Sequence, residues 1–416
     1  MTVQSPTRPR SEGSDGGDPE ARRRRARRRV GPPAAKRWRW VYPVVLLALA
    51  VGAAVLSVAG AELILDSRDG QIARSQLDPT APGYLAAVSP TPTLLAVHED
   101  DDGNLVSAVV LTMGPDDIGG GVAVLPPEMF VQLDPDEPGV SLAAVYDEFG
   151  VEDLETGQGL RAAVSTLFGA DVDTVLSVDA ASLTRLIEPL APLEYSLADP
   201  VRTTSGGKTV SLLPAGPVAI DTTDDIVAAT EILGPKEDPV RRAERVQRFW
   251  HAWIEKLRAT PDPAAGFPLG SADTQLARFL RGLAAGSARV DLVPYGQYLG
   301  LLVPQADELP RFVQQLVPYP RQAGVRTSVA VYNGVGDLEL NKSMSRDLVA
   351  AGAQILWVGN TDSFEVDETT VVYHQPGARD RAEALADAIG VTEVRFEEKA
   401  ESDLEVTVTI GRDYHA

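Results

Sequence analysis

The chain has 416 residues, 44% of them hydrophobic, and a formal net charge of −21. This length is enough for about two ordinary globular domains. It contains no cysteine, which excludes disulfide bonds, zinc–thiolate sites and a cysteine nucleophile. Residues 1–40 carry a net charge of +8, so that the rest of the chain carries −29. So acidic a remainder argues against nucleic acid as a partner, because phosphate contacts need cations.

The first 61 residues predict a membrane anchor. Residues 1–40 are rich in Gly, Pro, Ser and Arg, which predicts a disordered, basic cytoplasmic tail. Residues 41–61 have no charged side chain, and as a helix they would span about 31 Å, enough to cross a bilayer. The basic flank predicts a single-pass protein of the cell membrane, with a cytoplasmic N-terminus and extracytoplasmic C-terminal domains. The alternatives are a cleaved signal peptide, because Ser57-Val58-Ala59 resembles a cleavage site, and a buried core helix, which would not need the flanking cations.

Residues 62–92 contain four prolines and little periodicity, which predicts a stalk. Residues 93–320 alternate apolar runs with helical patterns and predict an α/β layered domain with a helical extension. Turn residues separate three neighbouring strands, predicted at 94–97, 106–113 and 121–126. The next elements are a helix at 154–168, a strand at 172–179, a helix at 181–190, a long helical pattern at 223–257, and short helices at 274–283 and 307–316.

Residues 325–416 predict a separate, small α+β domain that folds on its own, in the order β-α-β-β-α-β. The two predicted helices, at 343–352 and 378–390, both end at a glycine. The first three strands are predicted at 325–332, 355–359 and 369–374, and the runs at 391–396 and 404–411 together complete this order.

Three patterns resemble ligand sites, and each has a structural interpretation. Acidic residues 99–102 resemble a calcium loop, but Leu105 takes the place of the required glycine, which favours a hairpin turn. The sequence SGGKT at 205–209 lacks the first glycine of a phosphate-binding loop, which favours an ordinary loop. Residues 241–253 contain four arginines followed by Phe249, Trp250 and Trp253. We interpret this as an aromatic core face with solvated arginines; binding of an anionic lipid head is the alternative, ahead of nucleic acid.

The two halves of the exterior part resemble a known combination of domains. The last domain resembles the LytR C-terminal domain in VAVYNGVG (329–336), AEALADAIG (382–390) and VTVTIGRDY (406–414). The preceding region resembles a divergent LytR–CpsA–Psr (LCP) catalytic domain: LRAAVSTLFGADVDTVLSVD (160–179) follows a family pattern, and RAERVQ (242–247) matches R-x-x-R-Q-Q. That family is associated with transfer of a glycopolymer from a polyprenyl-pyrophosphate carrier onto peptidoglycan.

The resemblance also shows that charged family residues are missing. Ala108 stands where the family has an Asp, and Pro127 stands where it has an Arg. Leu233 lies near the position of a further Arg. Because such chemistry needs cations on the pyrophosphate and carboxylates for Mg²⁺ or base catalysis, these replacements predict a degenerate site.

The charged and polar residues that remain are Glu128, Arg242, Arg245 and Gln247. They are the candidates for binding an anion or a lipid phosphate, whereas no catalytic residue and no metal ligand are predicted. The predicted function is a non-catalytic binding or scaffold protein of the cell envelope. The alternative is an active glycopolymer–peptidoglycan phosphotransferase with relocated catalytic residues, and Mg²⁺ is a cofactor only in that alternative.

The expected partners agree with this function and compartment. They are membrane lipid, polyprenyl-phosphate intermediates, cell-wall polymer or envelope proteins, and not nucleic acid. A role in transcription is excluded because the predicted folded part lies across the membrane from DNA and is acidic.

Overall fold

The computed structural model describes residues 78–133, 136, 138–153, 157–235, 237–262, 274–298, 301–322, 325–398 and 403–415. The predicted tail (1–40) and membrane helix (41–61) lie outside these residues. Within the described part, every helix is too short or too polar to cross a membrane.

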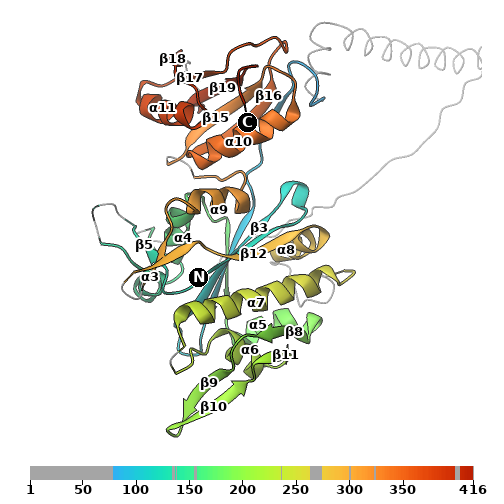
Figure 1. Ribbon diagram of the computed structural model, residues 1–416, viewed down its shortest axis with the longest axis vertical. Coiled ribbons are helices and arrows are strands. Elements are labelled where there is room, and N and C mark those ends of the chain that lie inside the picture. The colour runs from blue at the N-terminus through green and yellow to red at the C-terminus, as the bar shows by residue number, and fades with distance from the viewer. Residues whose placement is uncertain are drawn as a thin grey trace, which may run out of the picture. The chain divides into compact units, whose positions relative to one another are not determined.

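A mixed five-stranded sheet forms the centre of the α/β domain (Figure 1). Strands β2, β3 and β4 are antiparallel neighbours, as the three apolar runs predict. At one edge of the sheet β7 pairs in parallel with β2, and at the other edge β12 pairs in parallel with β4. Every residue of β3 is buried, because helices cover both faces of the sheet. The strands, in spatial order, are β12 (Ala288–Leu292), β4 (Gly120–Leu125), β3 (Leu105–Met113), β2 (Thr93–Glu99) and β7 (Thr174–Val178).

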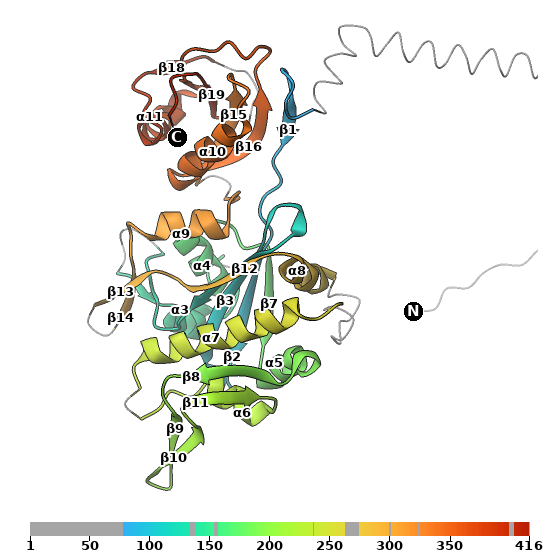
Figure 2. The same cartoon turned by 45° about the vertical axis from the view of Figure 1, so that its right-hand side comes forward.

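Helices pack on both faces of this sheet through two separate apolar cores, which confirms the predicted α/β layered fold (Figure 2). The first face carries α5 (Ala180–Ile187), α6 (Thr223–Thr230), α7 (Pro239–Arg258) and α8 (Thr274–Ala285). The other face carries α3 (Leu142–Phe149), α4 (Leu160–Phe168) and α9 (Leu309–Leu316). Short 3₁₀ helices are η1 (Pro115–Asp117) and η2 (Glu188–Leu190).

The helical pattern over 223–257 forms two helices, α6 and α7. Pro235 lies between them and α7 begins at Pro239, a residue that is tolerated in a first turn but not in a helix interior. The predicted aromatic face of α7 is buried. Trp250 and Trp253 meet edge to face with ring centroids 5.4 Å apart, and Phe249 is fully buried.

Several antiparallel strand pairs have no counterpart among the predicted elements. They are β5 (Phe130–Val131) with β6 (Val140–Ser141), β8 (Leu193–Leu197) with β11 (Gly216–Ile220), β9 (Val201–Ser205) with β10 (Lys208–Leu213), and β13 (Tyr295–Tyr298) with β14 (Leu301–Pro304). The SGGKT sequence forms the β9–β10 turn, in which Gly206 and Gly207 have φ angles of 56° and 75°.

The acidic sequence at 99–102 forms the predicted hairpin turn, between β2 and β3. The side chain of Asp100 accepts hydrogen bonds from the backbone N–H groups of Asp102 (3.0 Å) and Asn104 (2.8 Å). Its carboxylate is therefore used to close the turn.

The C-terminal domain has a six-stranded sheet covered by α10 (Leu338–Ala350) and α11 (Arg379–Ala388), with a short η3 (Pro376–Ala378). Its core is continuous and includes Val329, Val331, Met344 and Leu348. The strands, in spatial order, are β1 (Leu85–Ala87), β16 (Ala353–Asn360), β15 (Thr327–Asn333), β19 (Val406–Ile410), β17 (Thr370–Tyr373) and β18 (Val394–Phe396).

The edge strand β1 comes from the segment predicted as a stalk. Leu85 pairs with Gly359 and Ala87 with Trp357 in an antiparallel ladder on β16. Residues 62–92 are thus not simply a spacer, because part of them completes the C-terminal sheet. Three residues are too few to give a recognisable alternation, which explains why the sequence pattern did not predict this strand.

Candidate functional site

The candidate site lies along the edge of the central sheet where several strands end, and not beside an outer strand. Strands β2, β4, β7 and β12 all run in the same direction, so that their carboxyl ends meet at this edge. Ligand sites of open α/β sheets commonly lie beyond such ends. Here the edge carries His98 from β2, Glu128 from the segment after β4 and Arg242 from the first turn of α7.

Two of the predicted residues form an ion pair there. Glu128 follows β4 by three residues, and Arg242 lies in the first turn of α7, which Asp238 caps. Arg242 Nη2 lies 2.6 Å from Glu128 Oε1, and the two side chains are 11% and 26% exposed. The other oxygen, Glu128 Oε2, is buried and has no hydrogen-bond partner among the described residues. The pair is nearly neutral, and an anionic ligand has to compete with Glu128 for Arg242.

The third candidate, Arg245, is part of the structural framework. Only 5% of this residue is exposed, and burial is the main cause that lowers its pKa, against the opposing charge of Glu237. It donates from Nε to the carbonyl oxygen of Ala229 (2.8 Å), and from its other nitrogens to Ile232 O and to Glu237. Arg245 therefore satisfies carbonyl groups at the end of α6 and does not face the site.

The fourth candidate, Gln247, also has a structural contact. Its side-chain Nε2 donates to the carbonyl oxygen of Val290 (2.9 Å) and ties α7 to β12. The motif over 242–247 thus brings only Arg242 to the sheet edge.

The replaced family positions are apolar in the structure as well. Ala108 is fully buried in β3 and belongs to the core below α3 and α4. Leu233 is 44% exposed and forms no part of the Glu128–Arg242 pair. Neither residue supplies a charge or a metal ligand.

Sequence reasoning missed two further polar pairs near the same edge. His98 is buried, and its Nε2 lies 3.2 Å from Glu231 Oε1. Burial, followed by the hydrogen bond and charge of Glu99, raises the pKa of Tyr146. His98 stands alone in the sequence, and only the fold brings it to Glu231, 133 residues away.

The donor set at this edge does not fit the Mg²⁺ ion that the family chemistry implies. Glu128 Oε1 is occupied by Arg242, and Ala108 offers no oxygen ligand. Among the described residues, no three acidic or histidine side chains come together in a way that could hold a metal ion.

The C-terminal domain belongs to a recognisable class. Residues 326–414 match the family model LytR_C, described as the LytR cell envelope-related transcriptional attenuator. This match confirms the predicted LytR C-terminal domain. The comparison with curated proteins gave no match.

A little over half of this chain is similar to several solved structures. TagV from B. subtilis shares 15% identity at a TM-score of 0.43, over 56% of this chain and 98% of that chain. A LytR-Csp2A-Psr enzyme from Actinomyces oris shares 17% identity at a TM-score of 0.40, over 55% of this chain and 94% of that chain.

A third structure contains a lipid. It is the LytR-CPS2A-psr family protein YwtF (TagT) from Bacillus subtilis with bound octaprenyl pyrophosphate, at 15% identity and a TM-score of 0.38, over 55% of this chain and 89% of that chain. Likeness at these values says nothing about the chemistry of the site in this chain, which depends on its own residues.

Proposed function

We propose that this chain is a membrane-anchored, extracytoplasmic protein of the cell envelope whose α/β domain binds a lipid-linked or polymeric wall intermediate without turning it over. The single observation that carries the proposal is the Glu128–Arg242 pair at the carboxyl end of the sheet. The pair keeps one cation and one carboxylate at the carboxyl ends of the strands, where ligands of such sheets commonly bind. The two charges neutralise each other.

Catalytic turnover of a pyrophosphate would require more charged groups than this edge of the sheet provides. A transition state of this kind needs several fixed cations around the phosphoryl oxygens and a carboxylate that is available as a base or metal ligand. Here Arg245 is committed to the end of α6, and Pro127 and Ala108 replace an Arg and an Asp of the family pattern. A well-placed donor is commonly worth about 3–4 kcal/mol to such a reaction, so that losing several removes measurable catalysis.

Binding without turnover requires fewer charged groups, and Arg242 of the pair is sufficient to contact a phosphate. The Arg242 guanidinium is held in place by α7 and by Glu128, and it can offer bidentate hydrogen bonds to a phosphate. The predicted membrane anchor at 41–61 and the LytR C-terminal domain support an envelope ligand at the membrane surface.

Binding to a polyprenyl pyrophosphate analogue tests this proposal. The full-length chain in lipid nanodiscs is titrated with the analogue. Arg242→Ala is expected to weaken binding by about tenfold, the effect of roughly 1.4 kcal/mol. Glu128→Gln is expected to strengthen it several-fold, because Arg242 is then released from its partner. The control is Arg281→Ala, which removes an exposed cation on α8.

The two variants together decide the outcome. If Arg242→Ala binds as tightly as the unchanged chain, the pair is not the ligand site. If Glu128→Gln weakens binding, the carboxylate contacts the ligand directly, and it does not compete with the ligand for Arg242.

A further inference from the structure

The sheet of the C-terminal domain has two chemically different faces. Helices α10 and α11 pack on one of them, and the strand residues that they cover form the core of the domain. In β19, Val406, Val408 and Ile410 belong to this core. Thr407 and Thr409 alternate with them and are partly exposed, so that they lie on the opposite face, which we call the outer face.

The register of the strands brings two aromatic side chains together on the outer face. In the parallel ladder of β15 and β16, Ala330 pairs with Trp357, and Tyr332 follows Ala330 by two residues. On the other side of β15, Ala330 pairs with Thr407 and Tyr332 pairs with Thr409. Paired residues point to the same side of a sheet. Trp357 and Tyr332 therefore share the outer face with the two threonines.

Small side chains flank Trp357 on both neighbouring strands. Its partner on β1 is Ala87, and its partner on β15 is Ala330. Two methyl groups leave the indole ring unobstructed, in agreement with the 41% exposure of Trp357. An exposed tryptophan on a strand is thus already accessible to a ligand.

Hydroxyl groups continue the outer face beyond the two rings. Thr370 of β17 pairs with Thr409 and is partly exposed beside it. The Thr407 hydroxyl lies 2.7 Å from Nε2 of His374, whose Nδ1 donates to the carbonyl oxygen of Glu397 (2.8 Å). Because Nδ1 donates, Nε2 accepts the hydroxyl proton of Thr407. The lone pairs of the Thr407 oxygen are then left to accept a hydrogen bond from a ligand.

The outer face carries no charge where these rings and hydroxyl groups lie. The next strand, β18, contributes Arg395, which pairs with Val372 in the sheet and forms an ion pair with Glu393 at 3.7 Å. The chain beyond residue 40 carries −29 in total. An anionic polymer would find little opposing charge here and would be repelled by the rest of the protein, so that the outer face suits a neutral ligand.

The size of the outer face argues against a folded protein as the ligand. Six strands at a spacing of about 4.8 Å span about 24 Å, and two rows of side chains cover about 13 Å along the strands. The product, roughly 300 Å², is well below the approximately 800 Å² that each partner of a stable complex buries. A second copy of this chain would not be held by so small a face, whereas a narrow polymer that crosses the strands would contact all of it.

We propose that the outer face binds a neutral polysaccharide chain, which stacks on Trp357 and Tyr332 and forms hydrogen bonds with the hydroxyl groups of Thr370, Thr407 and Thr409. A sugar ring presents C–H groups on its faces and hydroxyl groups at its rim. The electron-rich face of an aromatic ring attracts C–H groups, and a threonine hydroxyl both donates and accepts. This site belongs to the C-terminal domain and goes beyond the proposed function, which concerns the α/β domain.

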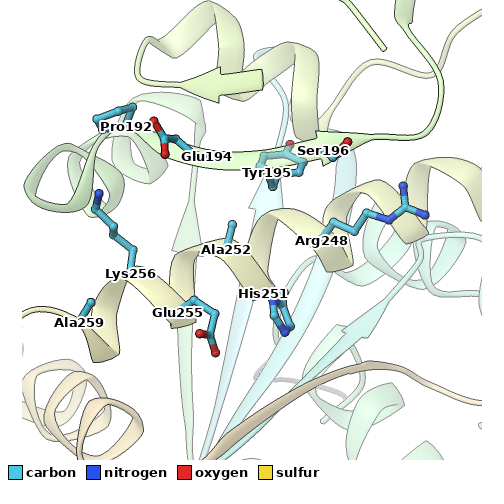
Figure 3. A pocket seen from close by; sticks show the side chains of 10 residues that line it. All are labelled: Pro192, Glu194, Tyr195, Ser196, Arg248, His251, Ala252, Glu255, Lys256 and Ala259. Carbon is cyan, nitrogen blue, oxygen red and sulfur yellow. The ribbon is translucent and has the colours of Figure 1, made fainter. Parts of the chain in front are cut away.

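The groove between strand β8 and the C-terminal half of α7 is less suitable for such a chain (Figure 3). Its volume is 410 Å³, and Arg248, Glu194 and Lys256 around it carry both signs of charge. The hydroxyl oxygen of Tyr195 is buried. A neutral sugar would cover charged groups without pairing them, which is unfavourable. The groove therefore supplies a reference position for the experiment.

Calorimetric titration of the full-length chain tests the ligand class, in micelles of a detergent that has no sugar head group. The neutral probes are chitohexaose and cellohexaose, and hexagalacturonate is the anionic probe of equal length. At least one neutral probe is expected to bind, and hexagalacturonate at least about tenfold more weakly, because its carboxylates meet no free cation. Absence of binding by both neutral probes, or equal or tighter binding of hexagalacturonate, would overturn the proposal.

Variants place the sugar on the outer face. Trp357→Ala is expected to weaken binding by at least about tenfold, and Trp357→Phe, which keeps a ring, by less. Thr370→Val combined with Thr409→Val keeps the shape and strand preference of both residues, and should weaken binding several-fold without lowering the melting temperature. Phe396→Ala is the matched control, because Phe396 is 48% exposed but packs with Tyr373 on the side of the helices. Unchanged binding by Trp357→Ala, or an equal loss in Phe396→Ala, would contradict the proposal.

Two further variants separate this site from the others. Arg248→Ala in the groove and Arg242→Ala at the edge of the central sheet are both expected to bind the neutral probe as the unchanged chain does. A loss in either variant would place the sugar there and overturn the proposal. The probes contain neither phosphate nor lipid, so that failure here is distinguishable from failure of the proposed function.

Discussion

Arg242 and Arg245 lie three residues apart on α7, yet they have different roles. Arg242 reaches the sheet edge and pairs with Glu128, a residue 114 positions earlier in the chain. Arg245 turns inward and holds the end of α6 and Glu237. A sequence motif fixes the spacing of the two arginines, and the packing around them decides which one a ligand can meet.

The buried role of Arg245 predicts a large effect on stability. Arg245→Ala leaves Glu237 and two carbonyl groups without their cation, and breaking a buried pair in this way costs about 3–5 kcal/mol. Chemical denaturation followed by tryptophan fluorescence measures this loss, because Trp250 and Trp253 lie in the same core. Arg241→Ala, at an exposed position on the same helix, should change stability by less than about 0.5 kcal/mol. Equal stability of the two variants would show that the buried contacts contribute little.

At the scale of the residues, the sequence could predict part of the site. The resemblance identified Glu128 and Arg242 together, and the structure brings them to 2.6 Å. The inward contacts of Arg245 and Gln247 depend on where α6 ends and where β12 runs, which no local pattern contains. The same holds for the contact between His98 and Glu231.

At the scale of the elements, burial decides what a pattern could reveal. Strand β3 was predicted at 106–113 and runs from Leu105 to Met113, because all of its residues are buried. Strand β10 gave no signal, since five of its six residues are exposed. Strand β1 is short and lies among prolines, and only its partner β16 makes it a strand.

The pairing of β1 depends on a glycine in β16. A side chain at Gly359 would place its Cβ 2.5 Å from the backbone oxygen of Tyr84. Gly359→Val is therefore expected to displace β1 while the rest of the C-terminal domain stays folded. Hydrogen exchange at the amides of Gly83 and Val88, which donate to Thr361 and Leu356, should become at least about tenfold faster.

The same exchange experiment contains its own controls. Amides of the central strands β15 and β19 should remain protected in Gly359→Val. Gly377→Val, at a site where a Cβ meets no atom within 4 Å, should leave β1 protected as well. Exchange that is unchanged at Gly83 and Val88 would mean that β1 tolerates the side chain, and exchange that rises throughout would mean that the domain has unfolded.

At the scale of the whole molecule, the charge distribution predicts the topology. The first 40 residues carry +8 and the remainder −29, on either side of the apolar segment at 41–61. The positive-inside rule then places the N-terminus in the cytoplasm and the folded domains outside. A reporter enzyme that is active only outside the cytoplasm should be active when fused to the C-terminus. Activity of a cytoplasmic reporter at that position would contradict this arrangement.

The most direct test of a binding protein without turnover is release of phosphate from a polyprenyl pyrophosphate analogue. The full-length chain in nanodiscs is incubated with the analogue and Mg²⁺, and the same assay is run with Arg242→Ala and Glu128→Gln. Because Arg242 and Glu128 neutralise each other at the sheet edge, we expect no release above the rate without protein, for all three chains. Mg²⁺-dependent release by the unchanged chain that Glu128→Gln and Arg242→Ala both abolish would contradict the proposed function and show an active transferase site built around this pair.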